Sequence, residues 1–249
     1  NTTGTGNTAV GFLASGLSTT GANNTAVGHG VLYQNTGSNN TAVGHGALDA
    51  NTSASNNTAV GYNSLGANTT GASNTAMGYN AGLSNTTGTA LSAFGQSAGQ
   101  SNTTGFANTA MGVSALSANT TAGSNTAIGY QAAKNNTTGS SNVAVGTSSL
   151  YTNATGNNNV AVGLEALYYN TGAGNNVGIG YRALKTSTIG QNNIAIGLNA
   201  LTALTTASNN VAIGYEALAS NTTATNNVAI GYQAGRFITT GAQNTLVGL

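Results

Sequence analysis

Apolar and polar residues follow one five-residue pattern that recurs along the whole chain. In the copy at 227–231, Asn-Val-Ala-Ile-Gly, an extended backbone places Val228 and Ile230 on one face and Ala229 and Gly231 on the other. Fifteen copies end in a glycine, and thirteen of the fourteen intervals between those glycines are 17 residues, the other being 16. A period this short and regular predicts one structural unit repeated many times.

The rest of each repeat predicts a second extended piece and then a turn. Residues 215–218, Tyr-Glu-Ala-Leu, keep a small residue in third place, and residues 68–71, Asn-Thr-Thr-Gly, are typical of turns. The one missing residue falls in the turn at 34–37, where a deletion does not change the direction in which the strand side chains point. We therefore predict an all-β fold, a parallel β-solenoid of about fifteen 17-residue coils, each with two short strands. Residues 1–249 then form a single repetitive segment, which we interpret as an excerpt of a longer repeat protein because it begins within a repeat.

Stacked coils would turn each position of the repeat into a column. The unbroken glycine column predicts a place where a side chain would clash with the neighbouring backbone or disrupt a required turn. The alanine column predicts a narrow coil interior. Asparagine at the start of the motif, often doubled as at 226–227, predicts amide ladders that satisfy backbone groups at a corner.

The column of valine, isoleucine and related residues lies opposite this Ala/Gly interior. An interior of Ala and Gly buries little apolar area, and a continuous apolar stripe facing water is avoided by soluble monomers. We therefore expect identical chains to cover one another's stripes. The predicted oligomer interface consists of Val10, Val27, Val43, Val60, Ile128, Val145, Val162, Ile179, Ile196, Ile213, Val228 and Ile230.

Composition argues against several classes of function. Charged residues make up 3% of the chain and the formal net charge is +1. Nucleic-acid binding needs clustered basic residues, whereas Lys134, Arg182, Lys185 and Arg236 are scattered over a hundred positions. No apolar run is long enough to span a bilayer, so we expect no membrane insertion by this segment. No set of nucleophile, base and orienting residue can be assembled, and we expect neither catalysis nor a cofactor.

Aromatic residues offer the only candidate ligand contacts. His29 and His45 follow the motif glycine in consecutive repeats, so stacking predicts rings about 5 Å apart. Tyrosines and Phe12 fill the same column, and we interpret both histidines as flat stacking side chains rather than metal ligands. That column could pack on itself, the reading we prefer, or form a ligand platform. Four tyrosines near the turn are expected to be exposed ligand contacts: Tyr33, Tyr151, Tyr168 and Tyr169.

The Asn-Val-Ala-Ile-Gly copies at 227–231 and 210–214, and 193–197 with Ile194, resemble the head repeats of trimeric autotransporter adhesins. Copies reading Asn-Thr-Ala-Val-Gly-Tyr, followed by Ala-Leu and Asn-Thr-Thr-Gly, are similar to repeats of phage tail fibres and bacterial surface fibres. The resemblance covers nearly the whole chain and implies a left-handed parallel β-roll. It also implies three chains packed side by side with Val and Ile toward the three-fold core. The chain departs in its longer period and in Asn for the usual Ser. The residue after Asn is Thr in early repeats and Val or Ile in most later ones, which implies a wetter N-terminal core.

From these features we expect a homotrimeric, extracellular or cell-surface (or virion) fibre segment that attaches to partners such as host-cell glycan or matrix. A purely structural filament or phage fibre shaft without its own ligand is the alternative. Ice or crystal-surface binding is a third hypothesis. Flat arrays of outward threonines at alternate strand positions carry that activity in other solenoids, and the turn threonines Thr69 and Thr70 are instead adjacent.

Overall fold

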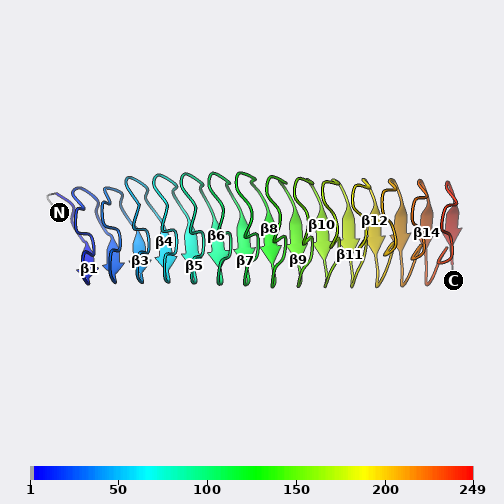
Figure 1. Cartoon of the computed structure of the whole chain (residues 1–249), viewed down its shortest axis with the longest axis horizontal. Helices are drawn as coiled ribbons and strands as arrows, with labels where there is room; N and C mark the ends of the chain where they lie inside the picture. Colours follow the sequence, from blue (N-terminus) through cyan, green and yellow to red (C-terminus); the bar gives the residue numbers. More distant parts are fainter. Residues whose placement is uncertain (1–2, 249) are drawn as a thin grey trace. The chain divides into compact units, whose positions relative to one another are not determined.

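The computed structural model describes residues 3–248, which divide into two compact units, Asn1–Ser124 and Asn125–Leu249. In each unit the chain runs in stacked coils that each contribute one strand of three residues (Figure 1). The first unit holds β1 (Thr8–Val10), β2 (Thr25–Val27), β3 (Thr41–Val43), β4 (Thr58–Val60), β5 (Thr75–Met77), β6 (Ser92–Phe94) and β7 (Thr109–Met111). The second holds β8 (Thr126–Ile128), β9 (Val143–Val145), β10 (Val160–Val162), β11 (Val177–Ile179), β12 (Ile194–Ile196), β13 (Val211–Ile213), β14 (Val228–Ile230) and β15 (Thr245–Val247).

Within each unit, neighbouring strands pair in parallel with equivalent repeat positions opposite one another. Val160 of β10 pairs with Val177 of β11, for example. The coil with the missing residue keeps this register, because Thr25 of β2 still pairs with Thr41 of β3. The prediction of a parallel β-solenoid with 17-residue coils is confirmed, and the deletion is absorbed by the turn.

The predicted second strand is wrong, because the segment after the glycine forms two consecutive tight turns. The N–H of Ala217 donates to the carbonyl of Gly214 (3.3 Å), and that of Ala219 donates to Glu216 (3.2 Å). Glu216 and Leu218 have φ of 51° and 49°. This left-handed geometry at alternate residues bends the chain, and the small residue in third place fits inside the bend rather than alternating along a strand.

The motif glycine is required both by its backbone angle and by its neighbour. Gly61 has a φ of 128°, where side chains are rarely tolerated. A Cβ at this position would lie 2.6 Å from the carbonyl oxygen of Gly78 in the next coil. Both reasons predicted for the invariant glycine column are therefore confirmed.

The coil interior contains leucine, which corrects the prediction of an interior lined by Ala and Gly alone. In the coil that contains β10, Ala161, Ala166 and Leu167 are all fully buried. Leucine occupies the position of Leu167 in most coils, and burying each leucine contributes roughly 1.5–3 kcal/mol. The motif glycine instead lies where the backbones of adjacent coils come close together. Each unit therefore has an apolar core of its own, larger than the sequence suggested.

Leu91 shows how this core tolerates a local change in the repeat. Two successive coils have glycine, Gly82 and Gly99, at the position where Leu65 and Leu116 stand in the flanking coils. Leu91 occupies a corner position that is asparagine in most other coils, and its side chain is 1% exposed. A Cβ added to Gly82 would lie 3.1 Å from Cδ2 of Leu91, so this leucine fills the space that the two glycines leave.

The predicted asparagine ladder at the start of the motif is confirmed. Asn57 is fully buried; its Oδ1 accepts the backbone N–H of Asn74 (2.9 Å), and its Nδ2 donates to the carbonyl of Gly71 (3.0 Å). Equivalent bonds recur at most coils of both units. The side chain thereby satisfies two buried backbone groups that no strand partner reaches.

A second asparagine ladder runs through the turns, where the sequence suggested only a turn-forming role. The Nδ2 of Asn68 donates to Oδ1 of Asn51 in the preceding coil (2.9 Å) and to the carbonyl of Gly71 (2.9 Å). Asn68 is fully buried. Left-handed backbone occurs at other residues of this corner, such as Ser73 with a φ of 60°. The asparagine of the turn therefore recurs in the repeat because its side chain forms a polar ladder in the interior.

Candidate interaction surfaces

The first and third residues of each strand form the outward face of the sheet in each unit. In β9, Ala144 is fully buried, while Val143 and Val145 on either side of it are half-buried. All twelve residues of the predicted oligomer interface occupy these outward positions. Four of the twelve are exposed: Val10 (57%), Ile128 (38%), Ile179 (37%) and Ile230 (41%). The others are half-buried: Val27, Val43, Val60, Val145, Val162, Ile196, Ile213 and Val228.

The outward face differs in chemistry between the two units. In β1–β7 its first column is threonine, with Ser92 in β6, so a hydroxyl column runs beside an apolar one. In β9–β14 both columns are Val or Ile throughout. We call the outward residues of β9–β14 the apolar strand face. On a strand spacing of about 4.8 Å, six strands extend this face over roughly 24–29 Å.

Aromatic rings stack along the column that follows the motif glycine. In the first unit Phe12, His29, His45, Tyr62 and Tyr79 form an unbroken stack, with centroid distances of 4.9–5.3 Å. The two imidazole centroids lie 4.9 Å apart, as predicted, between an aromatic ring on each side. Because rings in such a stack cover one another's faces, mainly their edges remain for contact with a ligand. The packing interpretation of this column is the one the geometry favours.

Three of the four turn tyrosines are less exposed than the column just described, which differs from the expectation. Tyr33, Tyr151 and Tyr168 are half-buried, and only Tyr169, at 46%, is exposed. Tyr62, in the stacked column, is 45% exposed. The rings of Tyr151 and Tyr168 are parallel, with centroids 4.9 Å apart, and lysine side chains lie over their other faces.

Charged side chains of the second unit pair around these tyrosines. Oε2 of Glu165 accepts from Nε of Arg182 (2.7 Å) and from Nζ of Lys185 (2.8 Å). The hydrogen bonds from Lys185 and then from Arg182 lower the pKa of the Glu165 carboxyl below its ordinary value. Burial, followed by the nearby tyrosines and Glu165, raises the pKa of the Tyr168 hydroxyl. Sequence reasoning had treated these charges as scattered.

Turn threonines use their hydroxyls within the solenoid. Oγ1 of Thr69 donates to the carbonyl of Thr86 in the next coil (3.0 Å), and Oγ1 of Thr86 donates to Thr103 (3.1 Å). The second threonine of the turn, such as Thr70, is exposed. Adjacent threonines therefore point differently, as the sequence indicated, and in the pair Thr69–Thr70 only Thr70 is exposed.

Within residues 3–248 no three His, Asp or Glu side chains gather closely enough to hold a metal ion, and no pocket is formed. No helix of the described chain has the length and apolar character to cross a bilayer. Comparisons with protein-family models, with characterised proteins and with solved structures found no match to this chain.

Proposed function

We propose that this chain is a repeat segment of an extracellular or cell-surface fibre, in which three copies associate through their strand faces and present repeated surfaces for attachment. The observation that supports it best is the apolar strand face of β9–β14, where twelve consecutive outward positions are Val or Ile. Ile194 and Ile230 on this face are 36% and 41% exposed in the single chain. Apolar patches of this extent on soluble proteins usually mark a protein interface.

A second copy of the same chain is the partner that this face fits best. An interface between identical copies brings the same columns together, and neither copy has a charge on this face to desolvate. The repeat spacing is also identical in the two copies, so apolar side chains match coil by coil. The number three rests on the resemblance to trimeric autotransporter heads and related fibres.

The leucine core changes what this association contributes. Because each unit already buries leucine inside its coils, a dissociated chain is expected to stay folded. Association then adds rigidity and avidity, since three linked copies convert weak contacts into useful attachment. In the first unit the threonine column makes the same face more polar, and we expect weaker association there.

Charged substitutions on the apolar strand face test this proposal. Replacing Ile213 and Ile230 by Asp places two carboxylates in each interface, which should dissociate the oligomer into folded monomers. Thr206→Asp is the matched control, because Thr206 is exposed in a turn and its substitution adds charge outside the strand face. Sedimentation velocity reports the oligomer, and far-UV circular dichroism reports the fold. Retention of the wild-type oligomer by the doubly substituted protein would refute the proposed interface.

Ice or crystal-surface binding is a second candidate, favoured by one feature of the first unit. Thr8, Thr25, Thr41, Thr58 and Thr75 form an outward column in register on consecutive strands. The neighbouring outward column is apolar rather than threonine, so the array has half the hydroxyls of a two-column threonine face. Thermal hysteresis in a freezing assay would favour this function over a fibre.

A further inference from the structure

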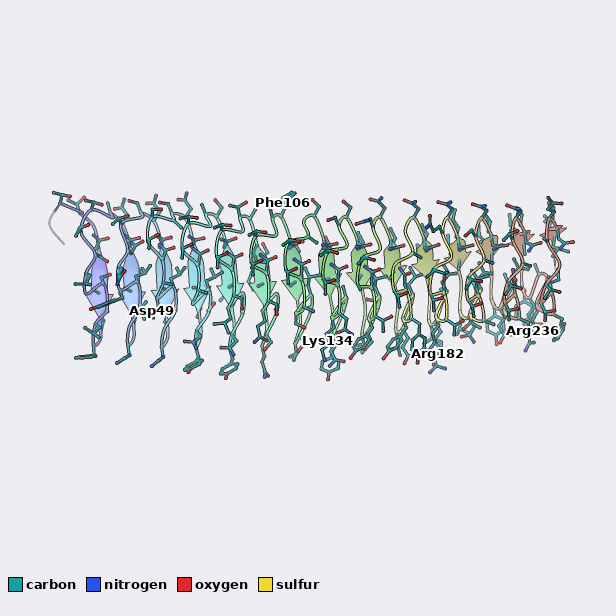
Figure 2. All side chains as sticks on the ribbon, turned by 45° about the horizontal axis from the view of Figure 1, so that its top comes forward. Asp49, Phe106, Lys134, Arg182 and Arg236 are labelled. Atoms are coloured by element: carbon teal, nitrogen blue, oxygen red, sulfur yellow. The ribbon has the colours of Figure 1, made fainter. Side chains whose placement is uncertain are left out.

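The basic residues of the second unit, distant in sequence, lie along one edge of the stacked coils. Lys134, Lys185 and Arg236 are separated by intervals of 51 residues, which is three coils of 17, so they occupy the same column. Figure 2 shows Lys134, Arg182 and Arg236 at the same edge of this unit. Three coils correspond to about 14 Å on the usual strand spacing, so this column places a positive charge at regular intervals. We call it the basic edge.

Two tyrosines occupy the basic edge between its first two lysines. The Nζ of Lys134 lies 5.8 Å from the ring centroid of Tyr151, and that of Lys185 lies 5.9 Å from the ring of Tyr168. The two rings stack on each other at 4.9 Å. The order is thus ammonium, ring, ring, ammonium, and cation–π contacts hold the lysines over the ring faces. Tyr169 meets Tyr168 edge-on, with centroids 4.7 Å apart.

Two carboxylates fix the geometry of the basic edge and neutralise part of its charge. Glu165 binds Lys185 and Arg182, and Oε2 of Glu216 lies 3.0 Å from Nε of Arg236. The second unit contains four basic residues and these two glutamates, which leaves a formal charge of +2. Arg182 and Arg236 keep 41% and 37% of their side-chain surface exposed, so they can contact a further anion.

We propose that the basic edge binds a linear acidic polysaccharide. Carboxylates along the sugar chain would pair with the evenly spaced ammonium and guanidinium groups, and the tyrosine hydroxyls would bond to sugar hydroxyls and carboxylates. An extended polyanion fits because the positive groups lie in a line rather than in a pocket. This inference rests on the attachment role proposed above and names the ligand class for it.

The covered tyrosine faces favour a polysaccharide over single-stranded nucleic acid. Single-strand binding depends on bases stacking on open aromatic faces. Here each face of the Tyr151–Tyr168 pair is occupied, by the other ring or by a lysine. Polar edges and charges remain available, and these suit a chain of carboxylates and hydroxyls.

The test is binding of fluorescently labelled polygalacturonate oligomers to the whole chain at low salt, with neutral dextran and single-stranded DNA as comparison probes. One variant combines Lys134→Gln, Lys185→Gln and Arg236→Gln. Its matched control keeps every charge by combining Lys134→Arg, Lys185→Arg and Arg236→Lys. A fourth protein carries Tyr151→Phe and Tyr168→Phe, which keep the ring stack and remove only the hydroxyls. Circular dichroism verifies that each protein is folded.

We expect polygalacturonate to bind the wild type and the charge-retaining control with similar affinity. Removing three positive charges should weaken binding about tenfold or more. Removing the hydroxyls should weaken it less, and binding should fall as salt screens the charges. Failure of polygalacturonate to bind at low salt, unchanged affinity in the glutamine variant, or tighter binding of DNA than of polygalacturonate would each overturn the inference.

The outcomes separate this inference from the proposed fibre. If the chain forms the expected oligomer in sedimentation but does not bind polygalacturonate, the basic edge has been wrongly assigned while the fibre proposal stands. If the chain is monomeric and binds polygalacturonate, and the glutamine variant no longer binds it, the basic edge is supported and the strand-face association is refuted.

Discussion

Replacing a ladder asparagine by leucine should destabilise the second unit strongly, because the side chain of Asn159 satisfies two buried backbone groups. Its Oδ1 accepts the N–H of Asn176 (3.1 Å), and its Nδ2 donates to the carbonyl of Ala173 (2.8 Å). Leucine can make neither bond. The Asn176 N–H would be left unpaired, which costs about 1–3 kcal/mol, whereas the Ala173 carbonyl keeps a bond from Nδ2 of Asn170 (3.1 Å) and loses one bond worth about 0.5–1.5 kcal/mol. Asn159→Leu should therefore lower the free energy of unfolding by roughly 1.5–4.5 kcal/mol.

Leucine also has no vacant space at this position. At Leu91 the neighbouring glycines Gly82 and Gly99 leave room for the leucine side chain, whereas the equivalent interior positions around Asn159 are the buried Leu150 and Leu167. Steric strain therefore adds to the lost hydrogen bonds. The same residue type is tolerated at one coil and excluded at another because the interior volume differs.

Guanidinium denaturation followed by far-UV circular dichroism measures the effect. Repeat proteins can unfold in stages, so the midpoints and the shape of each transition are compared as well as fitted energies. Asn158→Gly is the matched control: Asn158 is exposed, its φ of 57° suits glycine, and its Nδ2 makes only an exposed contact of 3.4 Å with Asn175. The control should change stability by about 0.5 kcal/mol. Equal midpoints for Asn159→Leu and the wild type would refute the ladder argument.

Three further substitutions test other elements of the fold. Gly163→Ala should destabilise severely, because its φ is 128° and a Cβ would lie 2.6 Å from the carbonyl oxygen of Gly180; a wild-type melting temperature would contradict this reasoning. Leu91→Ala should cost about 2–5 kcal/mol in chemical denaturation by emptying the space beside two glycines, and a change below about 1 kcal/mol would mean that the coils close over it. Glu165→Gln tests a pH effect. The lowered carboxyl pKa gives stability that is present above its unfolded value near 4.5 and is lost as pH falls through the folded pKa. The melting temperature of the wild type should therefore fall further between pH 7 and pH 3 than that of Glu165→Gln. Equal decreases would show that the ion pairs contribute nothing to stability.

The period of the sequence predicted the parallel coils, their register and the glycine column, because each of these is repeated at every coil. A strand pairs in register when equivalent residues recur at a fixed distance, as Val160 and Val177 do. The amide ladder at Asn57 was predictable for the same reason: a buried position that repeats a polar side chain needs the neighbouring copy as its partner.

The turns and the interior could not be read in the same way. Leu218 has a φ of 49°, a conformation that leucine seldom adopts, so its local preference suggests an extended chain. Packing overrides this preference because the left-handed bend brings the leucine into the core, where it is fully buried. The deep ladder of Asn68 was missed because asparagine in an Asn-Thr-Thr-Gly segment has an equally good explanation as a turn former.

The candidate surfaces could likewise be predicted from the sequence only in part. The outward strand face follows from simple alternation, and its residues lie where alternation placed them. The basic edge was missed, although the spacing of Lys134, Lys185 and Arg236 at multiples of 17 residues contained the signal. Distance along the sequence is a poor guide in a solenoid; position within the repeat determines which side chains meet.

The native mass of the particle tests the central claim most directly. Sedimentation equilibrium at several protein concentrations should give three times the 24.2 kDa mass of one chain. Substitution of Ile213 and Ile230 by Asp should reduce the mass to that of one folded chain. A wild-type protein that remains a folded 24.2 kDa monomer at every concentration would contradict association through the apolar strand face.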